Sequence, residues 1–270
     1  MMDFINGLPV SPEMLGILFF VAMLAGFIDS IAGGGGLLTV PALLAVGVPP
    51  AQALATNKLQ SVGGSFSASL YFIRRKAVDL NDQKLVIALT FIGSMIGSIL
   101  VQNMRADILR QLLPILVAGI GIYFLLTPRL GESDRQRRLS YIPFAIVAGC
   151  CVGFYDGFFG PGAGSFYALA YVTLCGFNLA KSTAHAKVLN FTSNLAALLF
   201  FMLGGKVIWS LGLVMLVGQV IGARTGAKMV LSKGQKLIRP MIVLVSLAMT
   251  CKLMYDNHGT EITQWLSHWF

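Results

Sequence analysis

Long apolar stretches separated by short polar loops dominate this chain. Five of them carry few or no charged residues: Met14–Gly36, Leu85–Met104, Leu112–Thr127, Tyr141–Phe159 and Lys236–Thr250. Their lengths approach the roughly 20 residues that a helix needs to cross the hydrocarbon core of a bilayer. The pattern predicts an all-α, polytopic membrane protein.

The composition and the distribution of charge indicate that the partner of this chain is a lipid bilayer, in which it is embedded. Of its 270 residues, 56% are hydrophobic and 11% are charged, which is too little charge to coat a water-soluble domain. The net charge of +9 lies in short loops between apolar stretches, as in residues that orient membrane proteins, so nucleic acid is not expected as a partner. The first residues include Asp3 and lack a basic region, so we expect no cleavable signal peptide.

Motifs for catalysis and for metal binding are missing from the sequence. It contains no HExxH, P-loop or GxSxG pattern, which argues against an enzyme. The four cysteines show no metal-ligand spacing and are interpreted as small core residues. Neither a cofactor nor a metal site is therefore predicted.

The chain repeats itself. GFIDS at 26–30 matches GFYDG at 153–157, and ALATNKLQS at 53–61 matches STAHAKVLN at 182–190, which aligns Lys58 with Lys187. This tandem duplication predicts a first transmembrane repeat at 1–127, a basic linker at 128–140, a second repeat at 141–256, and an interfacial amphipathic tail at 257–270.

Each repeat contains an interrupted helix. An aspartate and a glycine-rich segment, Gly33–Gly36 or Gly160–Gly164, precede a short apolar piece, Leu37–Val48 or Ser165–Gly176. These pieces are too short to cross a bilayer alone, so they are predicted to be half-helices. Three further spans follow in each repeat. Whether the broken pairs span fully or re-enter stays open, giving about ten or about eight spans.

Basic loops predict the orientation. Lys and Arg gather at 74–84, in the linker and at 228–239, which places these three loops in the cytoplasm and both termini outside. Strict alternation then puts the equivalent loops Arg74–Lys84 and Gly204–Ile208 on opposite sides of the membrane. The two repeats are therefore predicted to have inverted topology.

Discontinuous helices in inverted repeats are typical of transporter substrate sites. A break exposes backbone N–H groups and the positive end of a helix dipole, and both attract an anion. Polar side chains at helical spacing surround the two lysines. The predicted substrate-binding residues are Lys58, Lys187, Asn57, Gln60, Asn190, Asn194, Gly34, Gly35, Gly36, Gly162, Gly164 and Ser165.

Asp29, Asp156 and His185 are candidates for proton coupling. Structural alternatives stand beside these assignments. The aspartates could simply pair with lysines, the lysines could snorkel to an interface, and His185 could be an interhelical hydrogen-bonding residue. Glycines outside the breaks, such as Gly93 and Gly218, are interpreted as close helix contacts.

At GFIDSIAGGGG, ALATNKLQ, GFYDGFFGPGAGSF and TAHAKVLN the chain resembles the TauE/SafE sulfite-exporter family, over roughly residues 12 to 256. The resemblance implies a multi-pass transporter of sulfite or organosulfur anions in the bacterial inner (plasma) membrane. With the orientation above, both termini are then expected in the periplasm. The second copy of the motif departs from the first: Pro161 and Ala163 replace glycines, and Ala186 replaces the equivalent of Asn57. An asymmetric site is the expected consequence.

The functional prediction is a secondary transporter, and specifically an exporter, of small anions such as sulfite or organosulfonates. A passive anion channel and a non-transporting membrane scaffold or assembly factor are the alternatives. The sequence leaves homo-oligomer formation open.

Overall fold

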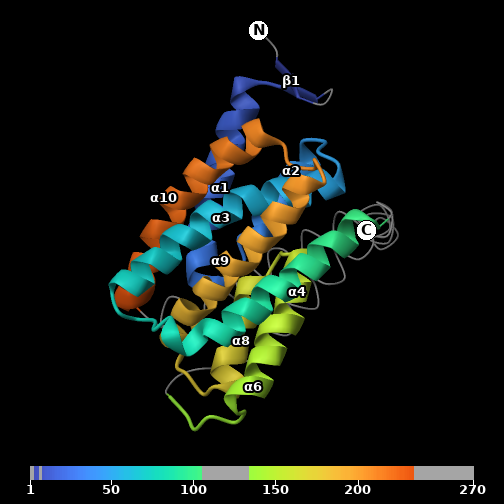
Figure 1. Ribbon diagram of the computed structural model, residues 1–270. Coiled ribbons are helices and arrows are strands. Elements are labelled where there is room, and N and C mark those ends of the chain that lie inside the picture. The colour runs from blue at the N-terminus through green and yellow to red at the C-terminus, as the bar shows by residue number, and fades with distance from the viewer. Residues whose placement is uncertain (1–2, 6–7, 105–133, 234–270) are drawn as a thin grey trace, which may run out of the picture.

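The computed structural model describes residues 3–5, 8–104 and 134–233. This part of the chain is helical apart from a hairpin of β1 (Asp3–Ile5) and β2 (Leu8–Val10), at the N-terminal end of the first helix (Figure 1). The stretches predicted at Leu112–Thr127 and Lys236–Thr250, the tail at 257–270 and the start of the linker lie outside the described residues.

The first half contains α1 (Pro12–Ala32), α2 (Gly36–Ala45), α3 (Pro50–Arg74), the short 3-10 helix η1 (Asn81–Gln83) and α4 (Lys84–Gln102). Ser11 caps α1, because its hydroxyl accepts a hydrogen bond from the amide of Met14. Gly33 ends α1 in the left-handed conformation, with φ of 79°.

The second half follows the same order. One run of helix comprises α6 (Tyr141–Phe144), the π-helical η2 (Ala145–Cys151) and α7 (Val152–Phe158). The half-helix α8 (Ala163–Leu174) and the long helices α9 (Leu179–Leu203) and α10 (Trp209–Lys233) follow. Each half thus contains a broken pair, a long lysine-bearing helix and a further span.

The half-helices are present, but their predicted bounds are wrong by a few residues. They begin at Gly36 and Ala163, not at Leu37 and Ser165. In the first, the amide of Leu38 already donates to the carbonyl oxygen of Gly35, so the helical turn includes the last glycine. They also end at Ala45 and Leu174, before the predicted Val48 and Gly176.

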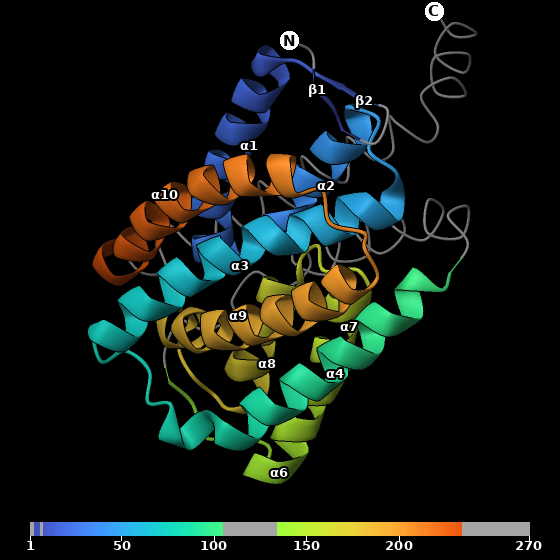
Figure 2. The same cartoon turned by 45° about the horizontal axis from the view of Figure 1, so that its top comes forward.

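The helices pack in an exchanged pattern. α10, α3, α9 and α4 lie side by side (Figure 2), α1 packs against α10, and α7 packs against α4. The first helix of each half therefore packs on the last described helix of the other half. The clusters of buried side chains show that α3 and α9 are antiparallel. Phe72, late in α3, belongs to the same cluster as Ala184, early in α9, whereas Ala55, early in α3, shares a cluster with Phe201, late in α9.

Close helix contacts depend on glycine, as the sequence predicts. A Cβ on Gly222 would lie 1.8 Å from the carbonyl oxygen of Met23, and one on Gly97 would lie 2.2 Å from that of Phe154. Among the described residues, five helical segments are long and apolar enough to cross a membrane. The prediction of an all-α, multi-pass membrane protein is confirmed.

Candidate anion-binding site

The two helix breaks touch each other in the middle of the bundle. A Cβ on Gly33 would lie 2.2 Å from the amide nitrogen of Ser165, and a Cβ on Gly164 would lie 2.7 Å from Cα of Gly33. The hydroxyl of Ser165 also donates to the carbonyl oxygen of Ala32. Such a close approach of backbone to backbone is open only to glycine. The repeats therefore bring their broken segments to one place.

Two buried ion pairs cross between the halves. Lys58 Nζ lies 2.5 Å from Asp156 Oδ1, and Lys187 Nζ lies 2.9 Å from Asp29 Oδ2. Both lysine side chains are 1% exposed, so the predicted alternative that they snorkel to an interface is wrong. The other predicted alternative, that the aspartates pair with lysines, agrees with the observed contacts. Pairing offsets the large desolvation cost of burying these charges in a low-dielectric interior.

Lys58 has no hydrogen-bonding capacity left. Its ammonium group donates to the carbonyl oxygen of Asp156 and to its Oδ1, both at 2.5 Å, and to Asn194 Oδ1 at 3.0 Å. Lysine has three N–H donors, so all three are used. The hydroxyl of Ser193 donates to the other carboxylate oxygen of Asp156. This pair is sealed and fully satisfied.

Lys187 is different. Within the described part of the chain its ammonium group donates one hydrogen bond, to Asp29 Oδ2, which leaves two N–H groups without an acceptor. Asp29 Oδ1 accepts from the amide of Gly35 at 3.2 Å. The Asp29 side chain is 11% exposed, compared with 1% for Asp156. The predicted asymmetry of the site therefore takes the form of one closed pair and one unsaturated pair.

Asn190 lies one helical turn beyond Lys187 and faces the second break. Its Oδ1 accepts from Asn194 Nδ2 at 2.9 Å, and its Nδ2 lies 3.1 Å from where a Cβ on Gly164 would be. No acceptor for Nδ2 is found among the described residues. Asn190 thus adds a donor beside the free N–H groups of Lys187.

Asn57 and Gln60 connect the first half-helix to α3. Asn57 Oδ1 accepts from Thr39 Oγ1 at 2.6 Å and from Gln60 Nε2 at 3.0 Å. Gln60 Oε1 is buried with no partner among the described atoms. Asn57 also lies beside the first break, since its Nδ2 is 3.5 Å from where a Cβ on Gly36 would be.

The breaks leave backbone amides free, as expected. The N–H groups of Gly34, Gly36, Gly162 and Gly164 have no hydrogen-bond acceptor in the described part of the chain. Two of the predicted donors are engaged: the amide of Gly35 by Asp29 and that of Ser165 by the carbonyl oxygen of Gly162. Four amides of the two breaks therefore have no partner among the described residues.

His185 lies apart from this cluster. Its Nδ1 is 2.9 Å from the carbonyl oxygen of Lys181, and its ring packs 5.0 Å from that of Phe177 and 5.3 Å from that of Tyr171. Its described hydrogen bond lies within its own helix, and it lines a separate cavity. In the described residues no group of three His, Cys, Asp or Glu side chains could hold a metal ion.

Two contributors were missed in the sequence. Ser193 donates to Asp156, and Thr39 donates to Asn57. The repeat alignment hides Ser193, because its counterpart in the first half is Gly64, which has no hydroxyl. Its helical spacing from Asn190 was a usable signal.

Comparison with known proteins decides the family. The family model described as "Sulfite exporter TauE/SafE" matches residues 18–253. The chain belongs to the TauE/SafE family. The resemblance predicted from its glycine and lysine motifs is confirmed, and the chain is a multi-pass membrane protein of a transporter family.

Relatives within the TauE/SafE family bear transporter names. The chain is 73% identical over 257 residues to "Probable membrane transporter protein YfcA" of Escherichia coli (strain K12), covering 95% of this chain and 96% of that protein. It is 55% identical over 245 residues to a "Probable membrane transporter protein" of Haemophilus influenzae, covering 91% and 96%. It is 24% identical over 266 residues to YunE of Bacillus subtilis, covering 89% and 97%.

Proposed function

We propose that this TauE/SafE protein is a secondary transporter that exports small anions, such as sulfite or organosulfonates, across the bacterial inner membrane. The observation that carries the proposal is the unsaturated ammonium group of Lys187. It has two unused N–H groups and lies in the same buried cluster as the free amides of the glycine breaks. Charge-assisted and backbone donors of this kind bind oxyanions.

The two ion pairs have different roles in this proposal. The four charged side chains sum to zero, so a bound anion would leave the cluster negative unless Asp29 accepts a proton or moves away. Lys58 and Asp156 hold the halves together, since their hydrogen-bonding groups satisfy each other and their neighbours. Lys187 binds the anion, with Asn190 and the glycine amides orienting it.

The course of the helices supports inverted repeats. α3 and α9 are equivalent helices of the two halves and are antiparallel. α3 begins near the loop at 204–208, where the amide of Ile208 donates to Thr56 Oγ1 at 3.1 Å, and ends near Lys76. The equivalent loops at 74–84 and 204–208 therefore lie at opposite ends of the bundle.

The basic loops support the predicted orientation. Lys76 and Arg137 line the same cavity, so the loop after α3 and the linker lie at the same end of the bundle. The positive-inside rule assigns that end to the cytoplasm. The start of α1 belongs to the same apolar cluster as Ile208, at the opposite end, which supports a periplasmic N-terminus.

Flux measurements test the proposal. The purified protein is reconstituted in liposomes and assayed for sulfite, thiosulfate, isethionate, sulfate and acetate, with unlabelled substrate on the opposite side. A carrier shows trans-stimulated flux of at least one anion. Flux without trans-stimulation would identify a passive channel instead, and an absence of flux for all of these anions would favour the scaffold.

The site is tested by matched variants. Lys187→Gln removes the unsaturated ammonium group and is expected to abolish flux and the thermal stabilisation by substrate. Lys206→Gln makes the same change in the loop after α9 and should leave both intact. Normal flux in Lys187→Gln would contradict the assignment of the site without contradicting transport itself.

A further inference from the structure

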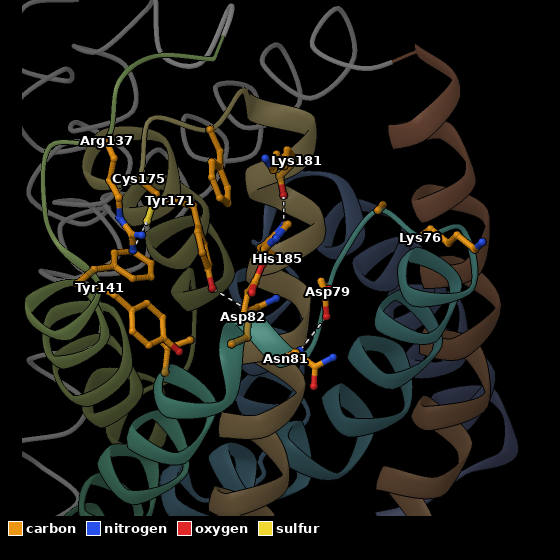
Figure 3. Close-up of a pocket in the computed structure, with 15 residues that line it drawn as sticks. Lys76, Asp79, Asn81, Asp82, Arg137, Tyr141, Tyr171, Cys175, Lys181 and His185 are labelled. Carbon is orange, nitrogen blue, oxygen red and sulfur yellow. Dashed lines mark hydrogen bonds between the residues drawn. The ribbon is translucent and has the colours of Figure 1, made fainter.

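A cavity lies away from the crossed ion pairs. Its volume is about 670 Å³, and it lies where the loop after α3, the linker before α6 and the loop between α8 and α9 meet (Figure 3). Asp29, Lys58, Asp156 and Lys187 are not among its lining residues. Both halves of the chain contribute to its walls. It is therefore a candidate site independent of the proposed transport site.

A buried hydrogen-bond donor without an acceptor, the side-chain amide of Gln83, lines this cavity. Gln83 is 1% exposed and lines the cavity. Its Oε1 accepts from the hydroxyl of Tyr171 at 2.7 Å, which orients the side-chain amide. Its Nε2 is buried and has no acceptor in the described part of the chain. Buried donors are normally satisfied, so this amide calls for an acceptor from a ligand or water.

The rim carries an excess of positive charge. Lys76, Arg137 and Lys181 line the cavity, and within the described residues none of them has a carboxylate partner within 4.0 Å. Asp79 and Asp82 also line it. Asp79 accepts from the amide of Asn81 at 2.9 Å, which engages it in the local turn. The rim therefore favours an acidic group over a basic one.

The walls are aromatic. The rings of Tyr171 and Phe177 stack with centroids 5.8 Å apart and an angle of 12° between their planes, and the ring of His185 packs against both. The ring of Phe144 lies 4.9 Å from that of Tyr171. Flat apolar walls with a few polar groups are typical of sites for organic ligands, whose pockets are about 300–1,000 Å³. A compact inorganic oxyanion would leave most of this volume unfilled.

We propose that this cavity binds an organic anion with an acidic head group and a planar apolar body. Arg137, Lys181 and the amide of Gln83 hold the head group, and the rings of Tyr171 and Phe177 contact the body. The ligand would touch both halves of the chain, because Gln83 belongs to the first half and Lys181 to the second. Occupancy would therefore hold the two halves in this arrangement at one end of the bundle.

Binding of simple probes tests the proposal without any flux assay. The full chain in phosphatidylcholine nanodiscs is titrated calorimetrically with benzoate, which has both parts, with acetate, which has the head group alone, and with benzamide, which has the body alone. Benzoate is expected to bind saturably and at least about tenfold more tightly than either of the others, because it uses both sets of contacts. Equal affinities, or no saturable binding of benzoate, would overturn the proposal.

Variants locate the binding. Arg137→Gln should lower the affinity for benzoate at least about tenfold, which is the scale of one lost charge-assisted hydrogen bond. Arg138→Gln, at an exposed neighbour that does not line the cavity, should not weaken it. Gln83→Leu should also weaken benzoate, and its melting temperature shows whether it folds. If benzoate binding is lost in Lys187→Gln and kept in Arg137→Gln, the probe binds in the central cluster and the proposal is wrong.

Discussion

Lys58 and Asp156 are 98 residues apart in the chain and come from opposite halves, yet their charged atoms Nζ and Oδ1 lie 2.5 Å apart in the core. Each side chain is 1% exposed. The second pair, Lys187 with Asp29, repeats the relationship with the halves exchanged. In this fold the buried charges of each half are therefore neutralised by the other half, which ties the two together.

Removing one partner of the sealed pair should destabilise the fold strongly. Lys58→Met leaves the Asp156 carboxylate buried without its counter-ion, a change that costs about 3–5 kcal/mol in other proteins. We expect a large fall in the unfolding temperature of the protein in nanodiscs. The double variant Lys58→Met/Asp156→Leu removes both charges and should recover much of the loss. A single variant as stable as the unmodified protein would contradict the structural role of this pair.

The crossing of the ion pairs could not have been predicted from the sequence. The repeat alignment identifies Asp29, Asp156, Lys58 and Lys187 as equivalent pairs, and burial makes acid–base pairing expected. However, Asp29 could pair equally well with the lysine of its own half or with that of the other half. The choice depends on how the breaks dock, and docking depends on tertiary contacts such as that between Gly33 and Ser165.

Helical periodicity explains why His185 lies apart from Lys187. The motif STAHAKVLN places it two residues before Lys187. Two residues correspond to about 200° around a helix, so the two side chains lie on nearly opposite faces. Lys187 and Asn190 share a face, as the spacing predicts, whereas His185 faces the aromatic cavity. Aligning the two repeats matches positions along the chain, but it does not indicate which face of the helix each side chain occupies.

The contact between the breaks predicts that alanine substitution destabilises the protein at Gly33, the C-cap of α1, but not at Gly16, within α1. Gly33→Ala forces a Cβ to within 2.2 Å of the amide nitrogen of Ser165 at a φ of 79°. The left-handed backbone alone costs about 1–2 kcal/mol, and the clash adds to it. Gly16→Ala, with no atom within 4 Å of the new Cβ, should be neutral or stabilise α1 by up to about 1 kcal/mol.

Yield and unfolding temperature of the two purified variants measure this difference. Gly33→Ala should give little folded protein, while Gly16→Ala should match or exceed the unmodified chain. Equal stability of the two would mean that the breaks do not dock as described.

Cys175 should react slowly with alkylating reagents at neutral pH. Burial raises the pKa of its thiol, while the guanidinium group of Arg137, with Nη2 3.9 Å from Sγ, acts in the opposite direction. Because the thiolate is the reactive form, the rate with iodoacetamide should keep rising with pH beyond the range in which a free cysteine levels off.

The measurement uses a background in which Cys150, Cys151 and Cys251 are replaced by Ser. Arg137→Gln should raise the pKa of Cys175 further and slow its alkylation at a fixed pH. Faster alkylation in that variant would show that opening of the cavity, not the charge of Arg137, controls the reaction.

Asp29 is the better candidate of the two aspartates for proton coupling. Its side chain is 11% exposed and its partner Lys187 is unsaturated, whereas Asp156 is 1% exposed and is held by Lys58 and Ser193. An uncharged residue at position 29 would remove a negative charge beside the proposed anion and free the remaining N–H of Lys187, so proton coupling through Asp29 would make flux depend on pH. Asp29→Asn fixes the uncharged state and should make flux independent of pH while substrate binding survives. Asp156→Asn should mainly lower stability. Reconstituted vesicles assayed between pH 5.5 and about 8, the range in which most proteins stay folded, give the answer; a pH dependence unchanged in both variants would exclude coupling through either carboxylate.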